Sequence, residues 1–230
     1  MSETRSVEHV VNGAHDLLER AERDLETGRI DEAEWYRRMA AVFTPAYLAG
    51  DNPRSQSGHG GDDARWAIAR GGIVDAIDRN GTFLDVGCAS GYLMESVRRW
   101  SAEKGFAVEP YGLDIAPELA ELARRRLPQW ADRIYAGNAL DWRPPMRFDF
   151  VRSGLEYVPK RRQRDLVEHL LRKVANPGGR LIIGTYNERR NARTIESLVS
   201  GWGFAIRGRS ERPHRDPRVC YRVVWIDNPG

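Results

Sequence analysis

The chain has 230 residues, of which 41% are hydrophobic and 30% are charged, and its formal net charge is +3. This length fits one domain, or one domain with an extension, and the composition excludes a disordered or collagen-like chain. No apolar run approaches the roughly 20 residues of a bilayer span, and the start of the chain is not a signal peptide. Two cysteines are too few for a disulfide framework or a cysteine-based zinc site. We therefore expect a cytoplasmic protein with no metal and no membrane contact.

Basic residues are concentrated in the C-terminal third of the chain. Residues 152–230 contain 17 basic and 8 acidic residues, and 33 of the 36 basic residues in the whole chain are arginine. Such a surplus can face the phosphates of a nucleic acid. It can equally be the solvated surface of an arginine-rich protein, and we favour this second interpretation.

Two amphipathic helices are predicted at the start of the chain. Apolar residues recur at helical spacing over residues 7–25, and Gly28 can end that helix in a left-handed cap. Asp31, three residues before Glu34, is a plausible cap for a second helix. Its apolar face continues as far as Thr44-Pro45, where we expect the helix to end.

A loop rich in Gly, Pro and Ser over residues 49–61 marks a domain boundary. After it, Asp62 or Asp63 can cap a third helix that we expect to stop at Asn80. We divide the chain into an N-terminal helical cap or lid with its loop, residues 1–61, and a second domain, residues 62–230. A helical prop and a dimer contact are alternative roles for the first part.

Predicted strands and helices alternate from residue 82 onward. Apolar strands separated by helices indicate a parallel sheet that is covered on both faces. No helix is predicted between the last two strands, so they should form an antiparallel hairpin at the sheet edge. The predicted fold is therefore α/β, with a doubly wound, mostly parallel sheet of seven strands. We expect strands over residues 82–87, 111–115, 133–136, 148–152, 180–186, 204–209 and 221–226, and helices over 92–103, 117–127, 160–174 and 192–200.

The sharpest motif is Asp85-Val-Gly-Cys-Ala-Ser-Gly91, in which a strand runs through a glycine-rich turn into a helix. Gly87 and Gly91 allow the backbone to approach a ligand, and the helix N-terminus supplies N–H donors. The dinucleotide fingerprint G-x-G-x-x-G is not matched, because Tyr92 stands where its last glycine belongs. Asp85 places a carboxylate in the turn, which suits a ligand with an ammonium group. A tight turn without a ligand is the alternative.

Asp114 ends the next predicted strand, 29 residues after Asp85. An acid at this position can accept hydrogen bonds from both ribose hydroxyls of a nucleotide. It can also cap the helix that begins at Pro117, and the two roles are compatible.

The two motifs resemble motif I and the acidic loop of the class I S-adenosylmethionine-dependent methyltransferases, which share a Rossmann-like fold. The resemblance covers roughly residues 63–227, and the order of strands and helices agrees throughout. It implies that S-adenosylmethionine is the cofactor and S-adenosylhomocysteine its product. Ala89 replaces the usual middle glycine of motif I, which is a small departure. The resemblance implies cofactor contacts for Asp85, Gly87, Cys88, Ala89, Gly91, Asp114 and Ile115.

Ala136-Gly-Asn-Ala-Leu-Asp-Trp142 resembles the segment that contacts the adenine in this family. It implies adenine contacts for Asn138, Ala139 and Leu140. Asn138 stands where the family has an aspartate, and its side-chain carbonyl can still accept a hydrogen bond from the adenine amino group. Trp142 could cover the adenine ring or belong to the core.

The loop after the fourth predicted strand resembles the segment where cofactor and acceptor meet in this family. The resemblance implies that Ser153 and Gly154 face the cofactor. Glu156 and Tyr157 are candidate bases for an acceptor that must lose a proton, and His59 in the glycine-rich loop is a third. Arg65 could pair with the cofactor carboxylate.

Some classes of methyl acceptor are disfavoured because the motifs of the enzymes that use them are missing from this sequence. Ser153-Gly-Leu-Glu156 does not match the Asn/Asp-Pro-Pro-aromatic motif of enzymes that methylate amino groups of nucleic acids. Neither cysteine follows a proline, as the nucleophile of pyrimidine-carbon methylating enzymes does, and no acidic pair has an obvious metal spacing. We expect an oxygen or nitrogen of a small molecule to be methylated. RNA or protein methylation, and a non-catalytic cofactor-binding module, are the alternatives, and the oligomeric state is not indicated.

Overall fold

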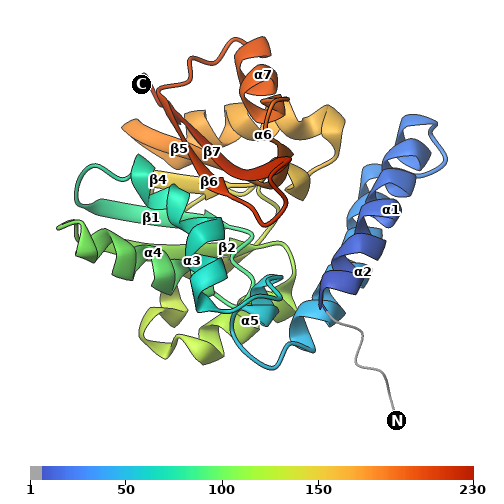
Figure 1. The fold of residues 1–230 in the computed structure, drawn as a ribbon, viewed down its shortest axis with the longest axis horizontal. Helices are drawn as coiled ribbons and strands as arrows, with labels where there is room; N and C mark the ends of the chain where they lie inside the picture. Colours follow the sequence, from blue (N-terminus) through green and yellow to red (C-terminus); the bar gives the residue numbers. More distant parts are fainter. Residues whose placement is uncertain (1–6) are drawn as a thin grey trace.

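The central sheet has seven strands in the order β3-β2-β1-β4-β5-β7-β6 (Figure 1). The computed structural model describes the backbone of residues 7–230 and their side chains except those of 7–15, 186 and 187. The five strands β1 to β5 are parallel, and β7 is antiparallel to both β5 and β6. The predicted sheet with its antiparallel edge hairpin is therefore confirmed. The strands are β1 (Gly81–Val86), β2 (Val108–Asp114), β3 (Ile134–Ala136), β4 (Phe148–Ser153), β5 (Ala175–Arg189), β6 (Gly208–Pro213) and β7 (Val219–Asp227).

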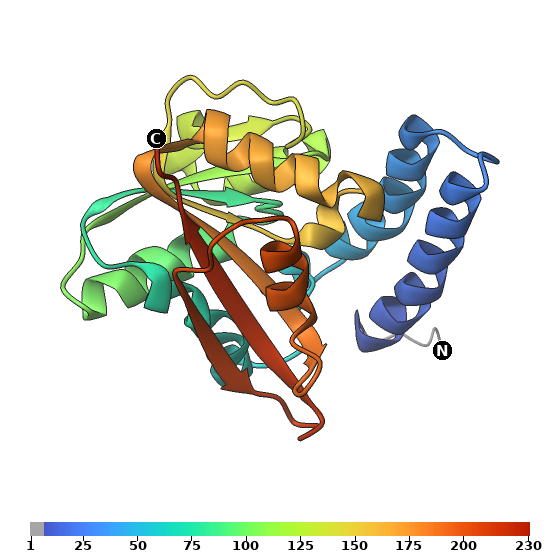
Figure 2. The ribbon, with the colours of Figure 1, turned by 90° about the horizontal axis from the view of Figure 1, so that it is seen from above.

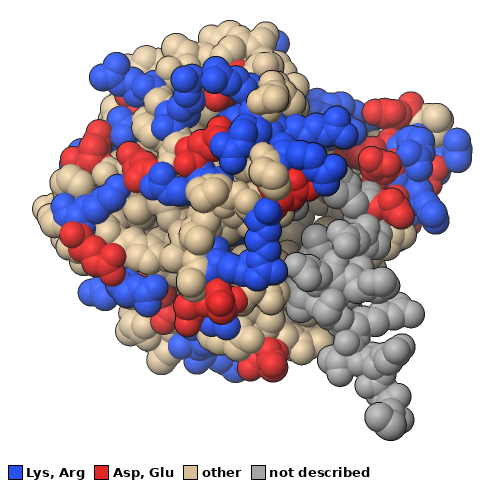
Figure 3. All heavy atoms as spheres, viewed as in Figure 1, with Lys and Arg blue, Asp and Glu red and all other residues tan. Residues whose placement is uncertain are grey.

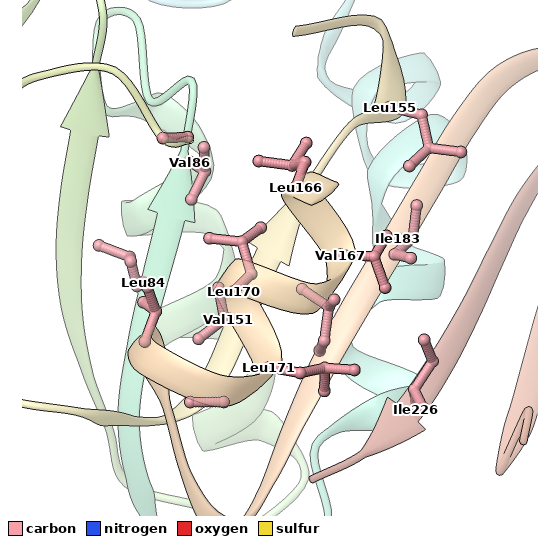
Figure 4. Packing of buried hydrophobic residues seen from close by; sticks show 14 of the residues in the cluster. Leu84, Val86, Val151, Leu155, Leu166, Val167, Leu170, Leu171, Ile183 and Ile226 are labelled. Atoms are coloured by element: carbon pink, nitrogen blue, oxygen red, sulfur yellow. The ribbon is translucent and has the colours of Figure 1, made fainter. Parts of the chain in front are cut away.

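Helices cover both faces of this sheet (Figure 1, Figure 2). On one face, apolar side chains of α6 and α7 pack over β1, β4 and β5. Figure 4 shows Leu166 and Leu170 in the same cluster as Leu84 and Val151, and full burial of such a side chain contributes about 1.5–3 kcal/mol. On the other face, α3 and α4 pack against β1 and β4. The helices are α3 (Asp63–Gly71), α4 (Tyr92–Glu103), α5 (Pro117–Arg126), α6 (Gln163–His169) and α7 (Thr194–Gly201).

The first two helices, α1 (Val7–Glu26) and α2 (Glu32–Leu48), form an antiparallel pair beside the sheet (Figure 1, Figure 2). The backbone N–H of Glu34 donates to Asp31 Oδ1 at 2.8 Å, which confirms the predicted cap. Trp35 is 1% exposed and holds the pair together against the apolar side chains of α1. The apolar positions predicted between residues 7 and 14 lie outside the described side chains.

Polar contacts tie this helical pair to the loop that follows β4. The Glu22 carboxylate accepts the backbone N–H of Lys160 at 3.3 Å, and Glu32 forms an ion pair with Arg161 at 3.0 Å. Exposed ion pairs of this kind contribute only about 0–1 kcal/mol each. The Glu22 carboxylate is buried, so its hydrogen bond and the apolar contacts of α2 together position the helical pair.

Several predicted boundaries are wrong. β5 extends over Ala175–Arg189, beyond the predicted residues 180–186 at both ends. α2 continues past Pro45 to Leu48, because a proline lacks only its own N–H and the Pro45 carbonyl still accepts from Ala49. The third helix ends at Gly71 and is followed by a 3-10 segment. β6 begins four residues later than predicted, because its register is set by pairing with β7, where Gly208 lies opposite Trp225.

Within the part of the chain that the structure describes, no helix is both long enough and apolar enough to cross a membrane.

Candidate functional site

A cavity of about 600 Å³ opens at the carboxyl ends of the central strands. The strand order reverses between β1 and β4, and open α/β sheets bind their ligands at such a switch point. The volume lies in the usual range of ligand sites, about 300–1,000 Å³. Side chains from the motif I turn, β2, β4, α2, α3 and the β6–β7 hairpin line the cavity.

The motif I turn is held by a carboxylate from the neighbouring strand. Gly87 and Ala89 have positive φ angles of 75° and 47°. The backbone N–H of Ala89 donates to Asp114 Oδ2 at 2.8 Å, and that of Ala116 donates to Oδ1 at 2.9 Å. Burial raises the pKa of Asp114, and these N–H groups oppose that rise. Asp114 therefore fixes the turn and the start of α5.

Asp85 and Arg152 form a buried ion pair beneath the turn. Their side chains are 1% and 3% exposed, and Arg152 Nη1 lies 3.2 Å from Asp85 Oδ1. Burial raises the pKa of Asp85 to about 6, although the adjacent guanidinium lowers it. The sequence had suggested a carboxylate facing a ligand ammonium, but it did not reveal this protein cation on the neighbouring strand.

Arg152 also contacts Tyr157 in the loop after β4. Its Nη1 donates to the Tyr157 hydroxyl oxygen at 2.8 Å. The phenol then accepts from arginine, so its own proton can be donated to another group. Glu156 is exposed, and its carboxylate folds over Gly154 at the rim of the cavity. Both predicted acid–base candidates in this loop line the cavity.

His59 also lines the cavity, although it comes from the glycine-rich loop. Its Nε2 is buried without a hydrogen-bond partner among the described residues, and its ring packs edge-on against Trp66. Burial, together with Arg70 and Arg65, lowers the pKa of His59 to about 4. The imidazole is therefore neutral at pH 7 and a weak base. No cluster of His, Cys, Asp and Glu among the described residues could hold a metal.

Family comparison decides what kind of protein carries this cavity. A model of the methyltransferase domain family matches residues 64–216, about two thirds of the chain. The chain belongs to this family. It is an S-adenosylmethionine-dependent methyltransferase with the Rossmann-like class I fold, as the sequence motifs predict. Among curated proteins, no match to the chain was found.

Solved structures with the same fold are distant in sequence. The 1,6-didemethyltoxoflavin-N1-methyltransferase of Burkholderia thailandensis is 18% identical, with a TM-score of 0.63 over 87% of this chain and 92% of its own. The N-methyltransferase NodS of Bradyrhizobium japonicum is 16% identical, with a TM-score of 0.56 over 83% and 98%. The [4+2]-cyclase SpnF is 14% identical, with a TM-score of 0.55 over 70% and 79%. At these identities the likeness shows the fold alone.

In the methyltransferase, the far end of the cavity lies at β2 and β3. Asn138 and Ala139 line it, as does Tyr36 from α2. The amide oxygen of Asn138 accepts the Leu140 N–H at 3.1 Å and keeps one lone pair. The buried hydroxyl of Tyr36 lies beside the Asn138 side chain; burial raises the pKa of Tyr36, and the interaction with Asn138 opposes that rise.

Most residues predicted at the cofactor come together in this one cavity, but four do not line it. Gly91 caps α4, and Leu127 lies 2.6 Å from where its Cβ would stand. Leu140 packs against the core. Ser153 is buried and its hydroxyl donates to the carbonyl of Gly154, which lies under Glu156. The predicted residues that do line the cavity are His59, Arg65, Asp85, Gly87, Cys88, Ala89, Asp114, Ile115, Asn138, Ala139, Glu156 and Tyr157.

Trp142 belongs to the core and does not line the cavity. Its ring is stacked on Phe148 at a centroid distance of 6.3 Å and also contacts Tyr135. This packing favours the core interpretation of Trp142 over its role as a cover for the adenine ring.

Several cavity-lining residues were missed at the sequence level. Arg152 gave a signal, because it and Asp149 are the two charges in a mainly apolar predicted strand. The others stand in segments without a motif, and only the fold brings them to the cavity. They are Trp35, Tyr36, Phe43, Tyr47, Arg70, Thr185, His214 and Tyr221.

We expect Gly87→Ala to damage the turn more than a matched glycine substitution elsewhere. Both Gly87 and Gly105 have positive φ, which costs a residue with a Cβ about 1–2 kcal/mol. A Cβ at Gly87 would stand 2.7 Å from the Tyr157 ring, whereas nothing lies within 4 Å of a Cβ at Gly105. Chemical unfolding should show a larger decrease in the free energy of unfolding for Gly87→Ala than for Gly105→Ala. Calorimetry should show weaker S-adenosylhomocysteine binding for that variant alone, and equal effects would contradict this account.

Proposed function

We propose that the methyltransferase moves the methyl group of S-adenosylmethionine to an oxygen or nitrogen of a small-molecule acceptor. The observation that carries this proposal is the single cavity, which runs from the motif I turn beneath α2 to the β6–β7 hairpin. A space of about 600 Å³ suits a cofactor with a small acceptor. α2 and the end of the loop over residues 49–61 line this cavity, which favours a small acceptor over a macromolecule. We also propose a cytoplasmic location, in keeping with two buried and unpaired cysteines.

The residues present fit S-adenosylmethionine. Asp85, Gly87 and Ala89 of the motif I turn line the cavity, where the methionine end of the cofactor would lie. The Asp114 carboxylate lines the cavity at the end of β2, where it can accept hydrogen bonds from the ribose hydroxyls. Asn138 supplies an amide for the adenine edge, and Arg65 or Arg70 supplies a cation for the cofactor carboxylate.

We propose that α1 and α2 act as a lid and that residues 1–61 form a part separate from the cofactor-binding domain, 62–230. α2 contributes apolar side chains to the cavity, and Tyr47 packs against Ala89 and Ala116 beside the cofactor turn. Ser57 bonds Ser90 at 2.8 Å, which fastens the following loop to the same turn. A lid of this kind excludes water from the reacting groups.

S-adenosylmethionine supplies an activated methyl group, which bonds to the acceptor lone pair while the electrons of the broken C–S bond stay on sulfur. The chain's own part is to bind and orient the acceptor, and such positioning can supply roughly 7–11 kcal/mol of the barrier. Where the acceptor carries a proton, Glu156 at the rim can take it, or the Tyr157 hydroxyl can relay it. His59 is the weaker candidate because its pKa is about 4.

The test of this function is conversion of S-adenosylmethionine to S-adenosylhomocysteine with a metabolite extract. We expect turnover with the low-molecular-weight fraction and none with the buffer alone. Tight cofactor binding without turnover, whatever fraction is added, would instead favour a non-catalytic binding module.

In that assay, Glu156→Gln and Tyr157→Phe should lower turnover more than cofactor affinity. Loss of a positioned acid–base group costs roughly 100-fold or more in rate, while cofactor contacts remain. Matched controls are Glu168→Gln and Tyr135→Phe, which change the same groups outside the cavity. If both loop variants keep full turnover, the acceptor is bound elsewhere.

An RNA acceptor is the alternative that the basic C-terminal third suggests. Many of these arginines pair with acids, including Arg180 with Asp227 and Arg212 with Asp75. Figure 3 shows acidic side chains lying among the basic ones on the face it presents. We therefore expect no RNA binding in a titration at low salt. Binding that weakens steeply as salt rises would support the alternative.

A further inference from the structure

The sheet order divides the cavity into two halves. β2 and β3, which lie on one side of β1, bring Asp114 and Asn138 to the cofactor half, where we propose the ribose and adenine. β5 and β7, on the other side of β4, bring Thr185 and Tyr221 to the opposite, acceptor half. The recognition of the adenine base therefore depends on the groups around Asn138.

An asparagine can recognise the adenine amino group with only one end of its side chain. The amino group is a donor, so it needs the amide oxygen of Asn138, whereas the amide NH2 would place donor against donor. An aspartate at this position would accept at both ends. The Asn138 amide therefore has to be held in one of two orientations, a requirement that rests on the proposed function.

Two neighbours define the orientation of this amide. The backbone N–H of Leu140 donates to Asn138 Oδ1 at 3.1 Å, which identifies that end as the oxygen. The hydroxyl of Tyr36 lies beside the same side chain, and their interaction opposes the rise that burial causes in the pKa of Tyr36. An N–H donor beside the phenol oxygen has this effect, because it stabilises the phenolate. Nδ2 of Asn138 is therefore the end that faces Tyr36.

The ring of Tyr36 is held in place on α2. The adjacent Trp35 is 1% exposed, and the two rings meet edge-on with centroids 5.1 Å apart and an interplanar angle of 88°. The Tyr36 hydroxyl oxygen is buried, so bulk water is kept away from its contact with the amide. A contact that water does not reach can fix the amide more firmly than an exposed one.

We propose that Tyr36 is a positioning residue for the cofactor base. Its hydroxyl oxygen accepts from Asn138 Nδ2, so that Asn138 Oδ1 keeps a lone pair for the adenine amino group. Without this hydroxyl, only the Leu140 N–H opposes a half turn of the amide. The turned amide would present Nδ2, which suits a base that has an oxygen in place of the amino group. The N-terminal helical pair thus contributes to the choice of base.

The test compares S-adenosylhomocysteine with its deaminated analogue S-inosylhomocysteine, in which an oxygen replaces the adenine amino group. Calorimetry on the full-length protein gives both dissociation constants. We expect the wild-type protein to prefer S-adenosylhomocysteine by at least about tenfold, because Asn138 Oδ1 would face a second acceptor in the analogue. Tyr36→Phe, which removes only the hydroxyl, should reduce this preference by roughly threefold or more. An unchanged preference in Tyr36→Phe, or none in the wild-type protein, would overturn the proposal.

A merely structural role of Tyr36 gives a different result. Loosening of α2 would weaken both ligands alike and leave the ratio of their dissociation constants unchanged. Tyr135→Phe removes a phenol hydroxyl outside the cavity and is the matched control, which should change neither affinity.

Asn138→Asp should remove the dependence on Tyr36. Its carboxylate accepts at both ends, so a half turn of the group changes nothing. We expect Asn138→Asp and Asn138→Asp/Tyr36→Phe to prefer S-adenosylhomocysteine equally, so that the effect of Tyr36→Phe depends on the asparagine. The same reduction by Tyr36→Phe in both backgrounds would overturn the proposal.

The proposed function and this inference can fail separately. Binding of S-adenosylhomocysteine with the same preference in the wild-type protein and in Tyr36→Phe would refute only the role of Tyr36. No binding of S-adenosylhomocysteine by the wild-type protein would refute the proposed function and, with it, the role of Tyr36.

Discussion

Asp114→Ala is expected to weaken S-adenosylhomocysteine binding by about 100-fold or more and to destabilise the protein at the same time. Two backbone N–H groups, of Ala89 and Ala116, donate to this carboxylate. Each buried donor that loses its partner costs about 1–3 kcal/mol, so we expect a loss of roughly 2–5 kcal/mol in the free energy of unfolding. The proposed ribose contacts are lost together with the turn that positions them.

Asp114→Asn removes the negative charge at this position and keeps the shape of the side chain. Its amide offers one oxygen, so only one of the two N–H groups can be satisfied and the other meets a second donor. We therefore expect asparagine to restore little of the affinity, measured by calorimetry. Asp132→Asn removes an exposed carboxylate and is the matched control. Affinity in Asp114→Ala equal to that of the control would refute the assignment of Asp114 to the cofactor.

The sheet and its switch point could be predicted from the sequence because their signals are local. Short apolar strands alternate with amphipathic helices along the chain. The glycine-rich turn after Asp85 identifies the strand before it as the first of the series. The helix over Tyr92–Glu103 was predicted to the residue, since a glycine precedes it and its apolar face is regular. The start of β6 was predicted four residues too early, because the position of β6 depends on pairing with β7. No local pattern in a strand of alternating exposure fixes that register.

The cofactor half of the site was predicted better than the acceptor half for a related reason. Residues around Asp85 and Asp114 directly follow strands, so the topology alone places them at the switch point. His214 and Tyr221 reach the cavity only because the hairpin folds back over α3, and Tyr36 only because α2 packs above Asn138. Such residues carry no spacing signal, because their neighbours in the cavity are far away in the sequence.

We expect the second large effect, on stability, when the buried ion pair between Arg152 and Asp85 is broken. Arg152→Met should lower the free energy of unfolding by about 3–5 kcal/mol at pH 8, because it leaves a buried carboxylate without its cation. Arg180→Met is the matched control, since Arg180 is also buried, with a side chain 9% exposed, but its partners Asp78 and Asp227 are exposed to water. Arg180→Met should lower the free energy of unfolding by less than Arg152→Met, because the carboxylates of Asp78 and Asp227 that it leaves without a cation are solvated.

The pH dependence of stability identifies the mechanism. The pKa of Asp85 is raised from 3.8 to about 6 in the folded state, so the protonated form is favoured by folding. The stability this contributes, about 3 kcal/mol, is full below pH 3.8 and is lost as the pH rises through 6. Without Arg152 the pKa of Asp85 in the folded state should rise further. The decrease in the free energy of unfolding with rising pH should then be larger and should extend to higher pH.

Urea unfolding at pH 5.5 and pH 8 should therefore show a small defect for Arg152→Met at the lower pH and a large one at the higher. Asp85→Asn removes the titrating group, and the double variant Asp85→Asn/Arg152→Met should recover most of the stability lost at pH 8. A defect of the same size at both pH values, or a double variant no more stable than Arg152→Met, would show that Arg152 acts through packing alone. The outcome also bears on catalysis, because the same guanidinium orients the Tyr157 hydroxyl and joins the cofactor turn to the acceptor loop.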